Sequence, residues 1–270
     1  MARQNANRIG KQAAIAVAIG WLSIAYPSAQ EAGAPAAPPL SPPCDVPGSD
    51  IATPVSLPNV VAALQKGEGE KVRILAIGSS STFGDGASSK AMSYPSQLET
   101  ILEQTLKGVD VVMVNRGIAG EVAETTAERI RNEVALRKPD LVLWQLGTND
   151  ALARIPLPEF EETVRSTIRW LRENQIDVVL VGVQYTTRLV RDENYAAIRD
   201  SLQKIAAEEK ILYVRRYDAM RFIAQRRANL QLLASDNFHL NDLGYHCMAE
   251  HVAHALIVSL YGKKGRPTQN

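Results

Sequence analysis

Short, continuously apolar runs alternate with longer amphipathic segments along most of this chain. The apolar runs cover residues 72–77, 109–114, 141–146, 178–183 and 211–214. Because successive positions are apolar, rather than every second one, these runs are typical of parallel strands that are covered on both faces. The segments between them repeat their apolar positions with helical spacing and cover residues 94–106, 122–137, 158–174 and 194–209. An irregular helical stretch over 219–233 and a helix over 242–261 complete the pattern.

Strands that alternate with helices predict βαβ units and a parallel sheet. We therefore expect an α/β fold, a three-layer α/β/α sandwich with a five-stranded parallel sheet of the flavodoxin-like type. Ligands bind at the carboxyl ends of the strands in such sheets. Small and polar residues follow the first three strands, at 78–84, 115–120 and 147–150. The functional site is expected at this end of the sheet.

The N-terminal segment, residues 1–29, has the pattern of an export signal. Arg3, Arg8 and Lys11 precede an uncharged apolar run over 13–26. As a helix, this run of 14 residues would span about 21 Å, less than the roughly 30 Å of a bilayer's hydrocarbon core. We expect cleavage, at a site that the sequence leaves open, and a periplasmic or secreted protein. An uncleaved anchor is the alternative, and stable membrane association is expected only in that case.

Residues 30–70 are rich in Ala, Pro and Gly and have little periodicity. They predict an extended linker and lead-in that stays outside the core. One domain over 71–262 and a C-terminal tail over 263–270 follow. Cys44 and Cys247 are the two cysteines of the chain, and in an oxidising compartment they could form a disulfide. Two unrelated thiols are the alternative, because the sequence does not set the distance between their Cα atoms.

The composition and charge of the chain bear on whether it binds nucleic acid. The chain is 46% apolar and carries 30 Lys and Arg against 29 Asp and Glu, for a net charge of +1. This composition suits a folded domain with a core. No block of five or more basic residues is present, so we expect no nucleic-acid partner.

The turn after the first strand, GSSSTFG at 78–84, is rich in serine and flanked by glycine. Such a turn suits a nucleophilic hydroxyl, a phosphate cradle of backbone N–H groups, or a plain structural connection. The phosphate interpretation is disfavoured because neither G-x-x-x-x-G-K-[ST] nor G-x-G-x-x-G occurs here, and no lysine follows before Lys90.

A serine nucleophile requires a base, and His239 is the only histidine outside the predicted final helix. Asp236 lies three residues before it, so its carboxylate could reach Nδ1 of the ring. An isolated D-x-x-H can equally be an aspartate that caps a turn beside a surface histidine.

The other histidines lie within the predicted helix over 242–261. His246, Glu250 and His254 follow one another at four-residue spacing, and His251 is adjacent to Glu250. The first and last of the three would lie about 12 Å apart along the helix axis, too far for one ion to join both. We expect a polar helix face and no metal or cofactor, with a two-ligand site at Glu250 and His254 as the alternative.

Taken together, these segments resemble the conserved blocks of the SGNH hydrolases, also called the GDSL esterase/lipase family, from about residue 73 to the final helix. Residues 74–84 resemble the block that carries the nucleophile, which would be Ser80. Gly120 in NRGIAG and Asn149 in GTND match the glycine and asparagine that complete the oxyanion hole with the Ser80 N–H. Asp236 and His239 match the D-x-x-H block.

The resemblance implies a serine esterase that hydrolyses carboxylic esters through an acyl-enzyme and needs no cofactor. Short acyl esters or glycan O-acyl esters are favoured as substrates. An O-acyltransferase acting on a carbohydrate and a non-catalytic glycan-binding module remain as alternatives. One departure is visible, since Ser79 replaces the aspartate of the G-D-S motif. For this reason Ser79 or Ser81 could be mistaken for the nucleophile.

Overall fold

The computed structural model describes residues 35–66 and 71–262 of the chain. The predicted export signal over 1–29 and the predicted tail over 263–270 lie outside these residues. No helix among the described residues is long and apolar enough to cross a membrane.

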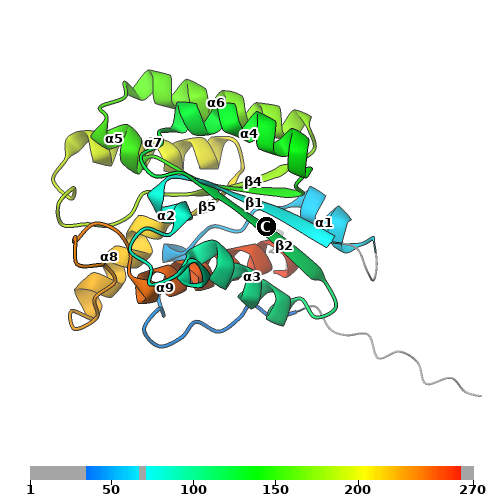
Figure 1. The fold of residues 1–270 in the computed structure, drawn as a ribbon, viewed down its shortest axis with the longest axis horizontal. Coiled ribbons are helices and arrows are strands. Elements are labelled where there is room, and N and C mark those ends of the chain that lie inside the picture. The colour runs from blue at the N-terminus through cyan, green and yellow to red at the C-terminus, as the bar shows by residue number, and fades with distance from the viewer. Residues whose placement is uncertain (1–34, 67–70, 263–270) are drawn as a thin grey trace, which may run out of the picture. The chain divides into compact units, whose positions relative to one another are not determined.

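Five parallel strands form one sheet, which confirms the predicted α/β class (Figure 1). The strands are β1 (Lys71–Gly78), β2 (Asp110–Gly117), β3 (Leu141–Gln145), β4 (Asp177–Val181) and β5 (Leu212–Val214). Their order is β2-β1-β3-β4-β5. The chain passes from β1 to one side and then returns to the other side of β1 to form β3. This reversal lies next to β1, where a crevice for ligands is expected at the carboxyl ends of the strands.

Helices cover both faces of the sheet, as Figure 1 shows. On one side lie α4 (Ala123–Arg137), α6 (Leu157–Glu173) and α7 (Glu193–Glu208), and on the other lie α3 (Tyr94–Thr105), α8 (Arg216–Arg226) and α9 (Asp242–Tyr261). Successive side chains of β1 point to opposite faces, so Ile74 and Ala76 join one apolar cluster whereas Leu75 and Ile77 join the other. This two-sided burial explains the continuously apolar strand sequences.

Short helices are the elements that periodicity did not reveal. They are α1 (Pro58–Leu64), α2 (Ser80–Phe83) and α5 (Thr148–Leu152), together with two 3-10 turns at Gly48–Asp50 and Lys90–Met92. Each is too short to show a helical repeat in the sequence. The predicted helical stretch over 219–233 also differs, because α8 runs from Arg216 to Arg226 and irregular chain follows it.

The prediction that residues 30–70 stay outside the core is wrong for the described part of this segment. Cys44, Val46 and Ile51 are buried in the same apolar cluster as α9. Ser41 donates hydrogen bonds from its backbone N and its Oγ to Oε2 of Glu250, each 3.0 Å long. An extended segment leaves its backbone N–H and C=O groups free, and here side chains of α9 and of Arg227, directly after α8, occupy several of them. We call residues 35–57 the N-terminal strap.

A disulfide joins the N-terminal strap to α9, which confirms the pairing of Cys44 with Cys247. The two Cα atoms lie 4.9 Å apart, although 203 positions separate the residues in the sequence. The bond therefore ties the start of the described chain to its last helix.

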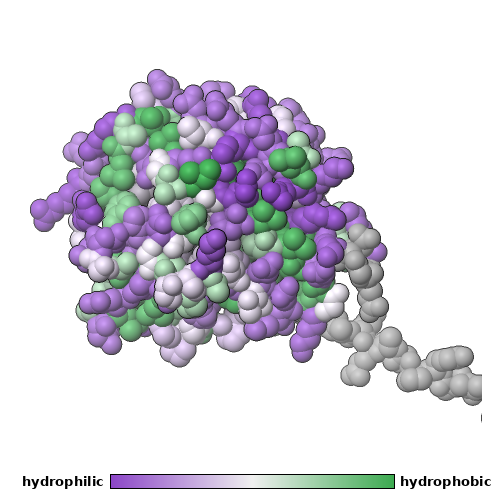
Figure 2. All heavy atoms as spheres, in the orientation of Figure 1, coloured by the Kyte–Doolittle hydropathy of each residue, from purple (hydrophilic) through white to green (hydrophobic). Residues whose placement is uncertain are grey.

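On one face of the domain, apolar and polar residues are mixed. Figure 2 shows hydrophobic residues interspersed with hydrophilic ones on the face that it presents. Among the described residues, the large apolar side chains that are exposed are Phe83, Ile118, Leu136, Leu152 and Val190. Two of these, Phe83 and Ile118, belong to the segments that follow β1 and β2.

Candidate active site

The serine turn connects β1 directly to α2. Ser79 has an extended backbone, and its carbonyl accepts hydrogen bonds of 3.0 Å from the N–H groups of Thr82 and Phe83. Ser80 is the first residue of α2 and is 8% exposed. The turn is therefore held by its own backbone at the carboxyl end of β1.

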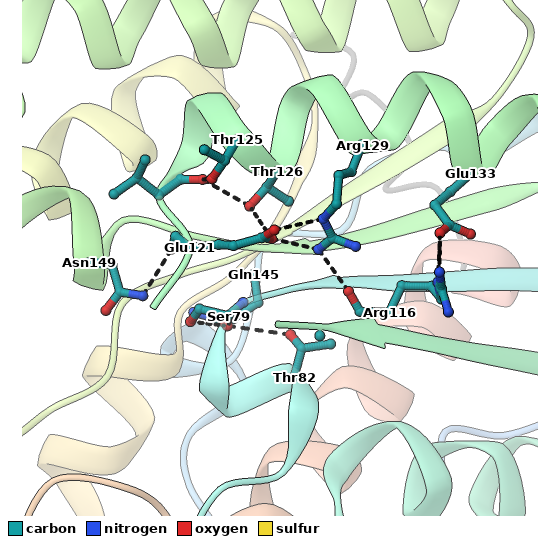
Figure 3. A network of polar contacts seen from close by, with 12 residues as sticks. Ser79, Thr82, Arg116, Glu121, Thr125, Thr126, Arg129, Glu133, Gln145 and Asn149 are labelled. Atoms are coloured by element: carbon teal, nitrogen blue, oxygen red, sulfur yellow. Dashed lines mark hydrogen bonds and ion pairs between the residues drawn. The ribbon is translucent and has the colours of Figure 1, made fainter. Parts of the chain in front are cut away.

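The serines on both sides of Ser80 have hydroxyl groups that are already engaged. Ser79 donates from its backbone N and its Oγ to Oε1 of Gln145, at the end of β3, with both distances 3.1 Å (Figure 3). The Oγ of Ser81 accepts a hydrogen bond of 3.1 Å from Nη2 of Arg216. Within the described residues, the Oγ of Ser80 makes no such contact. Ser80 is thus the serine of this turn whose hydroxyl is left for a substrate.

The same contacts explain how the turn tolerates Ser79 in place of the aspartate of G-D-S. The side-chain oxygen of Gln145 accepts hydrogen bonds from the hydroxyl and the backbone N–H of Ser79. It also accepts one of 3.3 Å from Oγ1 of Thr82. An uncharged side chain on β3 therefore fastens the turn to the sheet.

The predicted oxyanion-hole residues come together after β2 and β3. Nδ2 of Asn149 donates to the carbonyl of Glu121, the residue after Gly120, at 2.9 Å (Figure 3). Gly120 has a φ of +82°, a left-handed conformation that glycine adopts without steric cost. A side-chain amide has two N–H hydrogens, so the second hydrogen of Asn149 stays free for another acceptor.

Asp150 joins the segment that follows β2 to the segment that follows β3. Its Oδ1 accepts from the N–H of Ala123 at 2.7 Å, and its Oδ2 accepts from the N–H of Gly147 at 3.0 Å. Burial raises the pKa of the Asp150 carboxyl, and these backbone hydrogen bonds oppose the increase. Asp150 therefore acts as a scaffold residue of the site.

An ion pair fixes the loop that carries Gly120. Nε of Arg129, on α4, donates to Oε1 of Glu121 at 2.7 Å, and its Nη2 donates to the carbonyl of Arg116 at 2.9 Å (Figure 3). The guanidinium thus joins both ends of the loop over 116–121.

His239 and Asp236 form the predicted pair. Nδ1 of His239 lies 2.5 Å from Oδ2 of Asp236. The other carboxylate oxygen accepts from the N–H groups of Phe238 and His239 at 2.9 and 3.0 Å. Burial opposes ionisation of Asp236, but these backbone hydrogen bonds and the imidazole hold its pKa below the ordinary value. The D-x-x-H spacing therefore lets one carboxylate bind both the loop backbone and Nδ1 of the ring. Nε2, the other ring nitrogen, is not used by Asp236.

The loop of His239 packs directly against the segment that follows α2. Gly86 has a φ of +90°, and a Cβ at this position would lie 2.4 Å from the carbonyl oxygen of Leu240 and 3.0 Å from Cβ of His239. Nearby, the hydroxyl of Tyr245 donates to the carbonyl of Asp85 at 2.6 Å. The structure thus brings the two loops together, although no hydrogen bond joins Ser80 Oγ to His239 among the described contacts. Such a bond often forms only when substrate is bound.

Of the alternative metal site at Glu250 and His254, Glu250 accepts hydrogen bonds from Ser41, whereas Nδ1 of His254 is buried without a hydrogen-bond partner among the described residues. His246 contacts Glu250 at 3.0 Å and Oε1 of Gln97 at 2.7 Å. His251 contacts the carbonyl of Cys44 at 2.7 Å, and burial lowers its pKa. In the described ranges, no group of three His, Cys, Asp or Glu residues is placed to hold a metal ion.

These features define the class of protein. A serine follows the first strand, a glycine and an asparagine follow the next two, and an Asp-His pair precedes the last helix, all at one end of an α/β/α sandwich, as in SGNH hydrolases. The model of the non-GDSL lipase-like family matches residues 43–260, and the chain belongs to this family.

The chain is similar to several esterases at low sequence identity. The chain is 26% identical to the isoamyl acetate-hydrolyzing esterase of Saccharomyces cerevisiae over 154 residues, which cover 49% of this chain and 63% of that enzyme. A two-domain esterase active on acetylated mannans superimposes with a TM-score of 0.66 and 19% identity, over 84% of this chain and 59% of that chain. An acetyl xylan esterase from Geobacillus stearothermophilus superimposes with a TM-score of 0.58 and 23% identity, over 70% of this chain and 95% of that chain.

Sequence reasoning missed the residues that hold the site together. Gln145, Glu121, Arg129 and Arg216 lie on separate elements, and none belongs to a short motif. A polar residue at the end of an otherwise apolar strand, as Gln145 is, was the one available signal.

Proposed function

We propose that this protein hydrolyses carboxylic esters through an acyl-enzyme on Ser80. The observation that carries the proposal is the free hydroxyl of Ser80 between two engaged serines, in a turn whose following segment packs at Gly86 against the Asp236–His239 loop. The match to the isoamyl acetate-hydrolyzing esterase supports ester hydrolysis.

In the first half-reaction, Oγ of Ser80 attacks the ester carbonyl carbon while Nε2 of His239 takes the hydroxyl proton. Asp236 holds the ring through Nδ1 and stabilises its cationic form. The N–H groups of Ser80 and Gly120 and the free hydrogen of Asn149 Nδ2 stabilise the negative carbonyl oxygen. The C–O bond to the alcohol then breaks, and His239 returns the proton to the leaving oxygen.

In the second half-reaction, water attacks the acyl-enzyme. His239 takes a proton from the water and returns it to Oγ of Ser80 as the acyl bond breaks.

We propose short acyl esters, including O-acetyl groups on glycans, as substrates. A hollow of about 370 Å³ lies beside α2, and Phe83, Lys90, Asn115, Arg116 and Ile118 are among its lining residues. Its volume is within the range of small-ligand sites, and apolar and polar groups both line it. The relatives act on isoamyl acetate, acetylated mannans and acetyl xylan, and all three substrates carry acetyl groups.

The experiment compares the purified full chain with its Ser80→Ala variant on acetyl, butyryl and octanoyl p-nitrophenyl esters. We expect turnover that falls with acyl length, and loss of turnover in Ser80→Ala with an unchanged melting temperature. Ser166→Ala is the matched control, because this serine lies on α6 and only donates to the carbonyl of Thr163.

Labelling with an organophosphonate locates the nucleophile by peptide mass spectrometry. An adduct on Ser79 or Ser81 would refute the assignment of Ser80. Transfer of the acyl group to an added sugar in preference to water would identify an acyltransferase, and absence of turnover on all esters would favour a glycan-binding module.

We also propose that the protein acts in an oxidising compartment, periplasmic or extracellular. The Cys44–Cys247 disulfide supports this location, since such bonds are rare in the cytosol. Cell fractionation with an antibody against the folded domain tests the proposal, and recovery from the cytosol with free thiols would contradict it.

A further inference from the structure

Arg216 is a fully buried cation that the mechanism above does not use. Its side chain lies at the start of α8 and is 2% exposed. Among the described residues, no carboxylate forms a salt bridge with it, and its Nε and Nη1 have no hydrogen-bond partner. Burying a charge without an opposite charge destabilises the folded state. A contribution to stability therefore does not explain why an arginine occupies this position.

One nitrogen of the Arg216 guanidinium joins the serine turn after β1 to the segment that follows β4. Nη2 donates to Oγ of Ser81 at 3.1 Å and to Oε1 of Gln184 at 2.8 Å. Nη2 carries two hydrogens, so both are used. Ser81 is the neighbour of Ser80 within α2.

Gln184 continues the connection to the base. Its Nε2 donates to the carbonyl of Phe238 at 2.9 Å, and Phe238 is the neighbour of His239. Gln184 is 1% exposed, and its own carbonyl accepts from the hydroxyl of Tyr195. The acceptor of Arg216 is thereby fixed in position.

The surroundings of Arg216 are polar but neutral. Burial lowers the pKa of its guanidinium, and the nearby tyrosines Tyr245, Tyr195 and Tyr94 oppose this decrease. Within the part of the chain that the structure describes, the hydrogen bonds of Arg216 go only to uncharged side chains, and no ion pair competes with them.

We infer that Arg216 is a positioning residue that aligns Ser80 with His239 through Ser81 on one side and Gln184 on the other. The inference rests on the proposed function, because it concerns the same nucleophile and base. A small displacement of either group is enough to slow the reaction, since a misplacement of about 1 Å can cost about 100-fold in rate.

The test is Arg216→Met in the full chain, with kcat, KM and melting temperature measured on p-nitrophenyl acetate. We expect kcat to fall about 10- to 100-fold with little change in KM. The melting temperature should be retained or raised, because an apolar side chain replaces an unpaired buried charge. A structural role predicts the reverse, a lower melting temperature and an unchanged kcat of the folded enzyme, and that result would overturn the inference.

Arg215→Met is the matched control. It removes the same side chain from the adjacent position, where Nη2 contacts only Oγ1 of Thr53 at 3.2 Å. We expect it to leave kcat unchanged. An equal loss of kcat in both variants would show an effect of net charge and refute positioning by Arg216.

A second pair of variants tests the connection if Arg216→Met does not fold. Ser81→Ala removes one acceptor of Arg216, and Gln184→Met removes the other together with the contact to Phe238. Each should slow phosphonylation of Ser80, and the double variant should be slowed by less than the product of the two effects, because both act through one guanidinium. Independent effects would overturn the inference. Failure of the proposed function is distinguishable, since the unmodified protein would then neither turn over ester nor be labelled at Ser80.

Discussion

At the scale of single residues, the site depends on which polar atoms are already occupied. Ser79 and Ser81 have chemical groups identical to that of Ser80, but Gln145 and Arg216 engage them. Asn149 is occupied only in part, since one hydrogen of its amide contacts the carbonyl of Glu121. The free hydroxyl and the free amide hydrogen are therefore the groups that can act on a substrate.

Asn149→Ala should lower kcat by about 100- to 1,000-fold with a small change in KM, the usual effect of removing one oxyanion-hole donor. Asn149→Asp should be at least as slow, because a carboxylate would stand where negative charge develops. Steady-state kinetics on p-nitrophenyl acetate with parallel thermal melts check both variants.

Asn194→Ala provides the control, since Nδ2 of this residue also donates to a backbone carbonyl, that of Ala151 in α5, at 3.0 Å. It should affect the melting temperature more than kcat. Near-normal kcat in Asn149→Asp would contradict the assignment of Asn149 to the oxyanion hole.

At the scale of elements, α9 has two tasks. Its first residues follow the loop of His239. The hydroxyl of Tyr245, in the first turn of α9, donates to the carbonyl of Asp85 in the segment after α2. Further along, Cys247, Glu250 and His251 hold the N-terminal strap. Two of the polar residues that suggested a metal site in the sequence, Glu250 and His251, therefore hold the N-terminal strap against this helix.

His251 should make the domain sensitive to mild acid. Burial lowers its pKa in the folded state, so the unfolded chain binds the proton more readily. The stability that the neutral ring contributes is present above the unfolded pKa of about 6.5 and is lost as the pH falls from there toward the lower folded value. Thermal melts of His251→Gln between pH 7.5 and 5 should show a smaller decrease than those of the unmodified protein, since glutamine can still donate to the carbonyl of Cys44.

His246→Gln is the comparison for this test, because this histidine is on the same helix but its side chain is 40% exposed. Its melts should follow those of the unmodified protein. An acid response of His251→Gln identical to that of the unmodified protein would show that another group causes the sensitivity.

At the scale of the whole molecule, two apolar clusters on either side of the sheet carry most of the burial, and the N-terminal strap extends one of them. The disulfide closes a loop across 203 positions. In the chain-entropy model, a closure of this length stabilises the folded state by about 5 kcal/mol, and measured values are typically about 2 to 4 kcal/mol.

The double variant Cys44→Ser/Cys247→Ser should therefore melt about 5 to 15 °C lower than the oxidised protein. Its kcat at 25 °C should change little, because the disulfide fastens the N-terminal strap and contacts none of the proposed catalytic residues. Differential scanning calorimetry with and without a thiol reductant measures the effect. The reductant should not shift the melt of the double variant, and an oxidised protein that melts no higher than the variant would contradict the prediction.

The amino-acid sequence by itself determined where the strands and the main helices lie along the chain. Each strand of a parallel sheet covered on both faces needs a continuous apolar run, and each covering helix needs an apolar stripe, so both leave a local periodic signal. The observed bounds of β1, α4 and α9 accordingly lie within a residue or so of those expected from the pattern. The D-x-x-H pair also follows from local sequence, because a three-residue separation suffices for the contact.

Only the tertiary structure decided which groups meet across the fold. Cys44 and Cys247, Ser79 and Gln145, and Ser81 and Arg216 are far apart in sequence, and no periodicity relates them. The N-terminal strap has too few apolar residues to form a core of its own, so its burial depends on the surface that α8 and α9 offer. The contacts of Ser79 and Ser81 arise because segments that follow different strands converge at one end of the sheet, and this convergence depends on the order of the strands in the sheet.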